Sequence, residues 1–195
     1  MKRPLPPFDP AATALVLIDL QHGVAARQTA PRPAAEVVRN SARLAAAARQ
    51  HGVLVVMVRV SFAPGRPNAV QSDVDEPMPS TLPSGWDQLV EEMQPEEGDV
   101  VITKHQWGAF YGTALDLELR RRGRRILVLA GIATNFGVES TAREAFERNY
   151  QLLLVEDAMA TSDAAAHDFA LTRIFPRLGR VCTVEDVLAA WSART

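Results

Sequence analysis

The chain has 195 residues, of which 47% are hydrophobic, and a formal net charge of −2. This length and apolar content suit one folded domain, 1–195. The near-neutral charge provides no broad attraction to nucleic acid or to an anionic membrane. With one cysteine, Cys182, no intrachain disulfide forms. The sequence contains no apolar run typical of a signal peptide or a membrane span, so we expect a cytoplasmic protein.

Short apolar, β-branched runs alternate along the chain with segments of helical periodicity. The apolar runs lack strict alternation with polar residues, which is typical of strands buried on both faces. The predicted strands cover 14–18, 53–60, 100–103, 126–130, 152–155 and 181–182. The predicted helices cover 36–50, 113–122, 135–148, 164–174 and 183–191. Because the two kinds alternate, we expect an α/β fold with a parallel sheet covered on both faces.

The stretch 61–94 interrupts this alternation and is rich in proline, glycine, serine and aspartate. Within it, only 86–93 has a helical pattern. An insert of this length in a compact domain is usually either a functional loop or a mobile one.

Polar residues directly follow several predicted strands. Ligands of open parallel sheets bind outside the carboxyl ends of the strands, so Asp19, Gln21 and Lys104 are candidates for a binding crevice. Desolvation after an apolar strand raises the pKa of a carboxyl group such as Asp19, unless a cation offsets it. Lys104 is a candidate for that cation, and such a pair can move a proton to or from a substrate. A buried ion pair without catalysis explains the same spacing equally well.

The stretch 131–137 has the pattern of a turn from a strand into a helix. Backbone N–H groups at a helix start form a site for an anion or an oxyanion. The spacing of Gly131 and Gly137 fits neither a dinucleotide fingerprint nor a phosphate-binding loop. The four histidines lack the spacing of a metal site, and we expect His167 at the solvated surface. Cys182 lies in an apolar run, which favours a buried and inert thiol.

Three segments, in their order and spacing, resemble motifs of the isochorismatase-like hydrolase family, which also includes nicotinamidases and carbamoylsarcosine hydrolases. They are 15–21, 104–113 and 131–143, and the resemblance covers nearly the whole chain. It implies a three-layer α/β/α fold with six parallel strands in the order 3-2-1-4-5-6. It also implies a cis peptide bond between Ile132 and Ala133, and self-association into a dimer or a tetramer.

The resemblance makes Asp19 and Lys104 catalytic and places Gly137 where most relatives have a nucleophilic cysteine. Glycine has no side chain, so attack by a thiolate is not available here. Isochorismatases proper also have glycine at this position. In them the aspartate protonates a vinyl ether as a general acid, and water then attacks. This chain differs from them at Ala133, where they have an aromatic residue.

The strand ends and the resemblance together supply the candidates for contact with a substrate, which are Gln21, Trp107, Phe110, Ile132, Ala133 and Thr134. For Phe110, packing of its loop onto the following helix is an alternative role. Nicotinamidases bind a metal through an Asp-x-His pair and a further histidine. The corresponding stretch, 61–79, contains no histidine. We therefore expect neither a metal nor a cofactor.

These observations favour a hydrolase without a cysteine nucleophile, acting on a small anionic substrate. Asp19 then supplies general acid/base chemistry, and water attacks. The alternative is a non-catalytic member that binds a small molecule or a partner. A third hypothesis, an amidase that uses Thr134 or Ser140 as nucleophile, is weaker because neither hydroxyl has an evident base other than Asp19.

Overall fold

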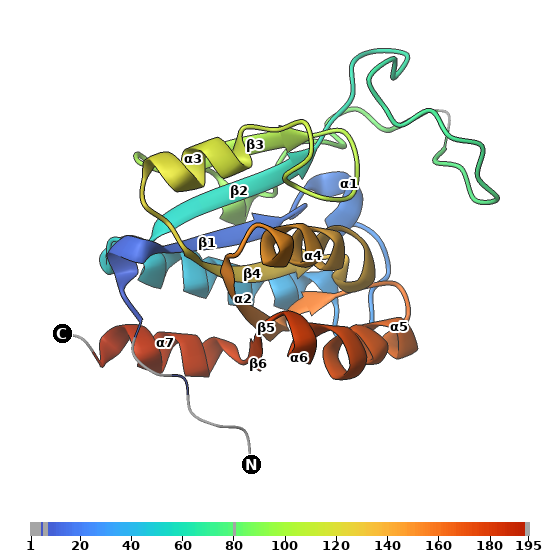
Figure 1. The fold of residues 1–195 in the computed structure, drawn as a ribbon. Coiled ribbons are helices and arrows are strands. Elements are labelled where there is room, and N and C mark those ends of the chain that lie inside the picture. The colour runs from blue at the N-terminus through green and yellow to red at the C-terminus, as the bar shows by residue number, and fades with distance from the viewer. Residues whose placement is uncertain (1–4, 6–7, 80, 194–195) are drawn as a thin grey trace.

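The computed structural model describes residue 5, residues 8–79 and residues 81–193, and the remaining residues of the expected 1–195 domain lie outside the described part. Within that part, six strands form one parallel sheet (Figure 1). Their order, β3-β2-β1-β4-β5-β6, confirms the expected order and the α/β class. The strands are β1 (Thr13–Ile18), β2 (Leu54–Val60), β3 (Val100–Lys104), β4 (Ile126–Ile132), β5 (Gln151–Ala160) and β6 (Arg180–Cys182).

Strand β1 lies between β2 and β4 near the centre of the sheet and is buried over its whole length. Its side chains alternate between the two faces of the sheet, as strand geometry requires. Leu15 and Leu17 belong to one hydrophobic core, and Val16 and Ile18 belong to the core on the opposite face. Because both faces are covered, the sequence of β1 is apolar throughout.

Helices cover both faces of the sheet and complete three layers (Figure 1). One core contains side chains of α2 and α7, and the other contains side chains of α3, α4 and α6. The helices are α1 (His22–Ala25), α2 (Ala34–Gln50), α3 (Leu115–Arg121), α4 (Glu139–Glu147), α5 (Ala164–Phe169), α6 (Phe175–Leu178) and α7 (Val184–Ser192). Among the described residues, no helix is long and apolar enough to cross a membrane.

Some segments differ from the expected ones. Strand β5 continues to Ala160, although its apolar run ends at 155. Its pairing with β4 shifts register between Leu129 and Gly131, and this irregular part of β5 holds the half-buried Glu156 and Asp157. The expected helices 135–148 and 164–174 each include a wide π-helical turn, Thr134–Val138 and Ala170–Ile174.

The insert 61–94 has little regular structure, and much of it extends away from the body of the protein (Figure 1). The expected helix at 86–93 is wrong, because only Glu91–Met93 is helical, as a short 3-10 turn. The end of the insert is nevertheless tied to the sheet. Leu89 forms a backbone bridge with Gln21, and Trp86 is buried and stacks on Phe62.

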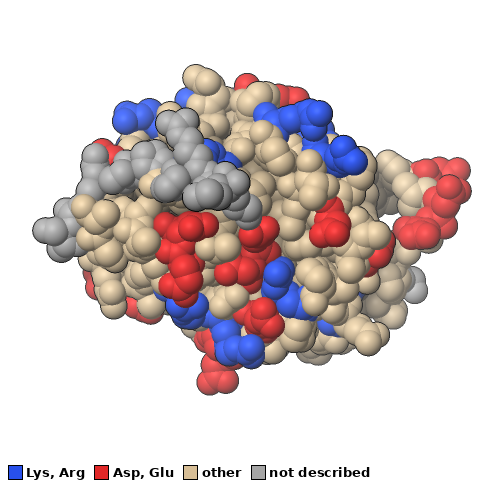
Figure 2. All heavy atoms as spheres, turned by 90° about the horizontal axis from the view of Figure 1, so that it is seen from below, with Lys and Arg blue, Asp and Glu red and all other residues tan. Residues whose placement is uncertain are grey.

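The surface carries charges of both signs. Figure 2 shows acidic and basic side chains interspersed on the face seen from below. An ion pair of 2.6 Å between Arg43 of α2 and Glu185 of α7 joins the two helices of one outer layer. Because both partners are largely exposed, this pair contributes little to stability.

Candidate active site

The candidate catalytic residues come from the carboxyl ends of three strands. Asp19 directly follows β1, Lys104 ends β3, and Gly137 lies in the turn after β4. Strand β2 separates β3 from β1, and Lys104 pairs with Val60 of β2. The long lysine side chain bridges this gap, so that its Nζ lies 2.8 Å from Oδ2 of Asp19. The structure therefore brings the two expected partners into direct contact.

Both members of this pair are withdrawn from solvent. The side chain of Lys104 is 1% exposed and that of Asp19 is 9% exposed. Burial raises the pKa of Asp19 to about 6, and the charge and hydrogen bond of Lys104 only partly oppose this effect. Nζ of Lys104 also donates a hydrogen bond of 2.5 Å to the carbonyl of Trp107. Oδ1 of Asp19 is buried without a hydrogen-bond partner among the described residues.

Gly137 faces the pair directly. A Cβ atom added at this residue would lie 3.1 Å from Oδ2 of Asp19, 3.1 Å from Nζ of Lys104 and 3.0 Å from Cγ2 of Ile18. A side chain at this position would therefore touch both the acid and the cation. Glycine keeps the pair in close contact with the turn and provides no nucleophile.

The turn that carries Gly137 is held from several sides. Gly131 has a φ of +127°, and a Cβ atom there would lie 2.2 Å from the carbonyl oxygen of Ile18. Only glycine fits such an approach of β4 to β1. The Ile132–Ala133 peptide bond is cis. At the other end of the turn, Oγ1 of Thr141 donates a hydrogen bond of 2.6 Å to the Gly137 carbonyl.

A buried histidine supports the same turn. Oγ1 of Thr134 lies 2.8 Å from Nδ1 of His167, and both residues are almost fully buried. The expectation of a solvated His167 is therefore wrong. Burial lowers the pKa of His167, which favours the neutral ring. The sequence contained a signal, because His167, Ala170 and Ile174 have the spacing of one helix face.

The expected substrate contacts occupy different environments. Trp107 is 62% exposed, and its ring meets the ring of Phe136 edge-on at 4.9 Å, beside Gly137. Phe110 instead lies in a hydrophobic core, where its ring packs against that of Tyr150, with 5.7 Å between the ring centroids.

Gln21 is buried, and both ends of its amide are engaged by backbone groups. Its Nε2 donates to the carbonyls of Val60 and Trp86, and its Oε1 accepts from the N–H of Val60. These bonds tie the insert to the end of β2. Ile132 is buried in the hydrophobic core that contains α2 and α7, called the α2 core below. Ala133 is partly buried and packs against the same core.

Potential metal ligands are scattered in the described part of the chain. Nowhere in it do three or more histidine, cysteine, aspartate or glutamate side chains gather in a group that could hold a metal ion. Asp19 can instead take up or release a proton beside the ammonium group of Lys104. The turn after β4 adds its backbone N–H groups next to this pair.

A sequence model of the isochorismatase domain matches residues 13–186. The chain belongs to the isochorismatase family. It is 45% identical to the isochorismatase family protein YecD of Escherichia coli O157:H7, over 91% of this chain and 95% of that protein. It is 35% identical to the ureidoacrylate amidohydrolase RutB of Klebsiella variicola (strain At-22), over 96% of this chain and 90% of that protein.

Solved structures of isochorismatase-family proteins share the fold. An isochorismatase family protein from Burkholderia thailandensis is 46% identical, with a TM-score of 0.91, covering 96% of this chain and 98% of that one. The N-carbamoylsarcosine amidase of Thermoplasma acidophilum is 28% identical, with a TM-score of 0.70, covering 89% of this chain and 96% of that one. Since its relatives in the family are hydrolases, this member of the isochorismatase family is a hydrolase as well.

Proposed function

We propose that this hydrolase acts without a cysteine nucleophile, on a small anionic substrate, through general acid/base chemistry by Asp19 and attack by water. The position of Gly137 carries the proposal. A side chain at this position would touch both Asp19 and Lys104, so the residue that faces the pair supplies no nucleophile. Cys182, the single cysteine of the sequence, is buried in β6.

The state of Asp19 supports a role in proton transfer. With a pKa of about 6, the carboxyl group is half protonated at pH 6 and about one-tenth protonated at pH 7. In the proposed reaction on a vinyl ether, Oδ1 gives its proton to the double bond, which leaves an oxocarbenium ion. Water adds to the carbon of this ion and returns a proton to the carboxylate, so Asp19 ends as it began. Lys104 stabilises the carboxylate between these two steps. The hemiketal that results breaks its C–O bond and releases an alcohol and a carbonyl compound.

The surroundings of the pair supply the proposed substrate contacts. The ammonium group of Lys104 and the helix start after β4 both favour an anionic group on the substrate. Ile132, Ala133 and Thr134 lie on the turn that faces the pair, and Trp107 borders it. We assign Gln21 a positioning role, because its amide is bonded to backbone groups. We also propose a single domain over 1–195 that works in the cytoplasm as a dimer or a tetramer.

The burial of the pair favours one competing function, a member that binds a small molecule or a partner without catalysis. The Lys104 side chain is only 1% exposed, as in a structural ion pair. In that case a ligand would bind and leave unchanged.

The two functions are separated by turnover of a substrate panel. Vinyl ethers, amides and carbamates are incubated with the wild-type protein, Asp19→Asn, Asp19→Ala and the control Asp168→Asn, which changes an exposed carboxylate of α5. Loss of a general acid reduces kcat/KM by about 100-fold to 10,000-fold. We expect this loss in both Asp19 variants and none in Asp168→Asn. Full activity in Asp19→Asn refutes the proposal, and binding without turnover supports the competing function.

A further inference from the structure

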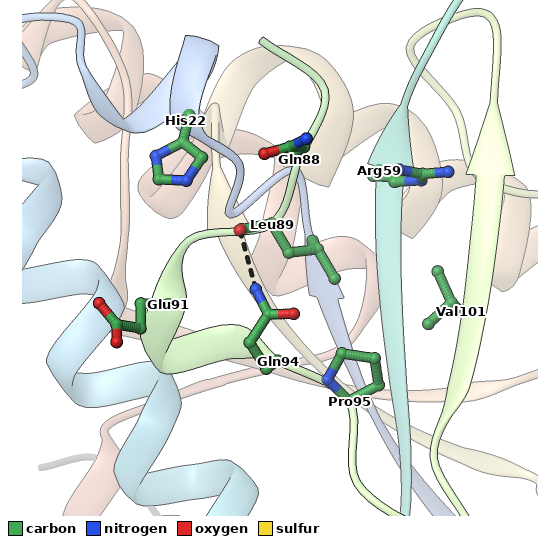
Figure 3. A pocket seen from close by; sticks show the side chains of 8 residues that line it. All are labelled: His22, Arg59, Gln88, Leu89, Glu91, Gln94, Pro95 and Val101. Carbon is green, nitrogen blue, oxygen red and sulfur yellow. Dashed lines mark hydrogen bonds between the residues drawn. The ribbon is translucent and has the colours of Figure 1, made fainter. Parts of the chain in front are cut away.

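An open cavity of about 490 Å³ lies on the other side of the sheet from the Asp19–Lys104 pair. It lies between the end of the insert and strands β2 and β3, of which β3 is the edge strand (Figure 3). Val101 of β3 lines it, and side chains three positions apart on a strand point to opposite faces, so Lys104 faces away from it. On this face the insert packs into the α2 core through Leu89. The cavity is therefore separate from the candidate active site.

Arg59 of β2 provides the positive charge of this cavity. The residue is partly buried, yet among the described residues its guanidinium group makes only two long hydrogen bonds. They are 3.3 Å from Nε to the hydroxyl of Thr103 and 3.4 Å from Nη1 to the carbonyl of Asp87. In the described part of the chain, no carboxylate oxygen lies within 4.0 Å of its nitrogens. The nearby carboxylate of Asp87 is engaged by the hydroxyl of Ser61, 2.5 Å away. A guanidinium group that lines a cavity and has no protein anion beside it favours a carboxylate ligand, which it can bind through two parallel hydrogen bonds.

The rest of the wall defines what else the ligand carries. Leu89, Pro95 and Val101 supply apolar surface, and Val101 is 41% exposed. Nε2 of Gln94 donates to the carbonyl of Leu89, which fixes the amide (Figure 3). Its Oε1 has no donor among the described residues and is open to an N–H group. Glu91 lies on the opposite side of Leu89 and Gln94 from Arg59 in Figure 3.

We propose that this cavity binds a small monocarboxylate that has an apolar body and an N–H group. The carboxylate pairs with Arg59, the apolar body covers Leu89 and Val101, and the N–H group donates to Gln94. The volume lies in the range of small-molecule sites, roughly 300 to 1,000 Å³. The wall holds one arginine and one glutamate, beside His22, which favours a single negative charge over a phosphate dianion. This site does not depend on the function proposed for Asp19.

The test uses three probes with the full chain, followed by nuclear magnetic resonance of the side-chain amides of Gln88 and Gln94. The probes are N-acetyl-L-leucine, its neutral analogue N-acetyl-L-leucinamide, and inorganic phosphate. We expect saturable shifts of both amides with N-acetyl-L-leucine. Loss of a charged hydrogen bond weakens binding roughly tenfold or more. We therefore expect at least that loss for the neutral analogue, and for N-acetyl-L-leucine with Arg59→Gln.

Two variants serve as matched controls. Arg43→Gln removes an exposed arginine of α2 that does not line the cavity, and this variant should bind the probe as the wild type does. Asp19→Asn should also bind it unchanged, which separates this cavity from the active site. The proposal is overturned if the amides do not shift, if the neutral analogue binds equally well, or if phosphate binds more tightly. Because the neutral analogue is tested on the wild type, the result stands even if Arg59→Gln does not fold.

Discussion

Replacement of Lys104 with methionine should make the stability of the protein depend more strongly on pH. The change removes a buried ammonium group, 2.8 Å from Asp19, and keeps an unbranched apolar side chain. Asp19 then remains buried without its cation. Its pKa, already raised to about 6, should rise further.

The magnitude follows from the pKa values of the native and unfolded chains. A raised pKa means that the native state holds the proton more tightly, so stability is complete below pH 3.8 and falls as the pH rises to about 6. At about 1.4 kcal/mol for each pH unit, the wild type loses about 3 kcal/mol of unfolding free energy over this range. In Lys104→Met the pKa of Asp19 rises above 6, so the unfolding free energy goes on falling above pH 6, at about 1.4 kcal/mol for each pH unit while the native carboxyl group stays protonated. Between pH 6 and pH 8 the variant should therefore lose up to about 3 kcal/mol more than the wild type.

Urea unfolding at pH 6 and pH 8 measures this difference. The loss of the Trp107 carbonyl partner is the same at both pH values, so it cancels. The double variant Asp19→Asn/Lys104→Met has no titrating group at this site, and its difference from the wild type should stay nearly constant. An equal difference between wild type and Lys104→Met at the two pH values would refute the reasoning, because something other than Lys104 would then stabilise the carboxylate.

Three further predictions concern the turn and the pair. In Gly137→Ala the added methyl group presses on Asp19 and Lys104, so kcat/KM should fall at least tenfold while unfolding free energy changes by less than about 2 kcal/mol. Unchanged turnover would contradict the close contact. His167→Ala leaves the buried Thr134 hydroxyl without its partner and should cost about 2 to 3 kcal/mol in thermal unfolding, with partial recovery in His167→Asn. A loss below about 1 kcal/mol would show that this bond matters little. Finally, kcat/KM should fall as the pH rises through about 6, because Asp19 then loses the proton that it donates. The midpoint of this fall should move to higher pH in Lys104→Met. A flat profile from pH 5 to pH 7 would argue against Asp19 as the proton donor.

Local sequence predicted the strands and much of the helical framework correctly. The run of β1 is apolar on both faces because the strand is central in the sheet, and its burial is complete. Other segments misled for local reasons. The polar residues Glu156 and Asp157 ended the predicted strand, whereas β5 carries them in an irregular part and continues to Ala160. The apolar spacing of 86–93 does not come from a helix. Leu89, Val90 and Met93 of this segment pack into the hydrophobic core that contains α2 and α7.

The candidate site divides in a similar way. Asp19, Lys104 and the turn with Gly137 were predicted from their places after strands and from the family motifs. The sequence could not show that Phe110 packs against Tyr150, or that the amide of Gln21 binds Val60 and Trp86. These contacts join segments that are distant in the chain. Their partners depend on how the loops fold over the sheet, which local periodicity does not record.

The sequence by itself determined the kinds of groups available: a carboxyl group after a buried strand, a lysine after another, and no thiol at position 137. Tertiary structure decided which of those groups meet and how far they are withdrawn from solvent. The strand order places β2 between β3 and β1, and Lys104 must reach across it to meet Asp19. Burial of that contact raises the pKa of Asp19 to about 6, because desolvation depends on everything packed around a group. Neighbours along the chain contribute only part of that environment.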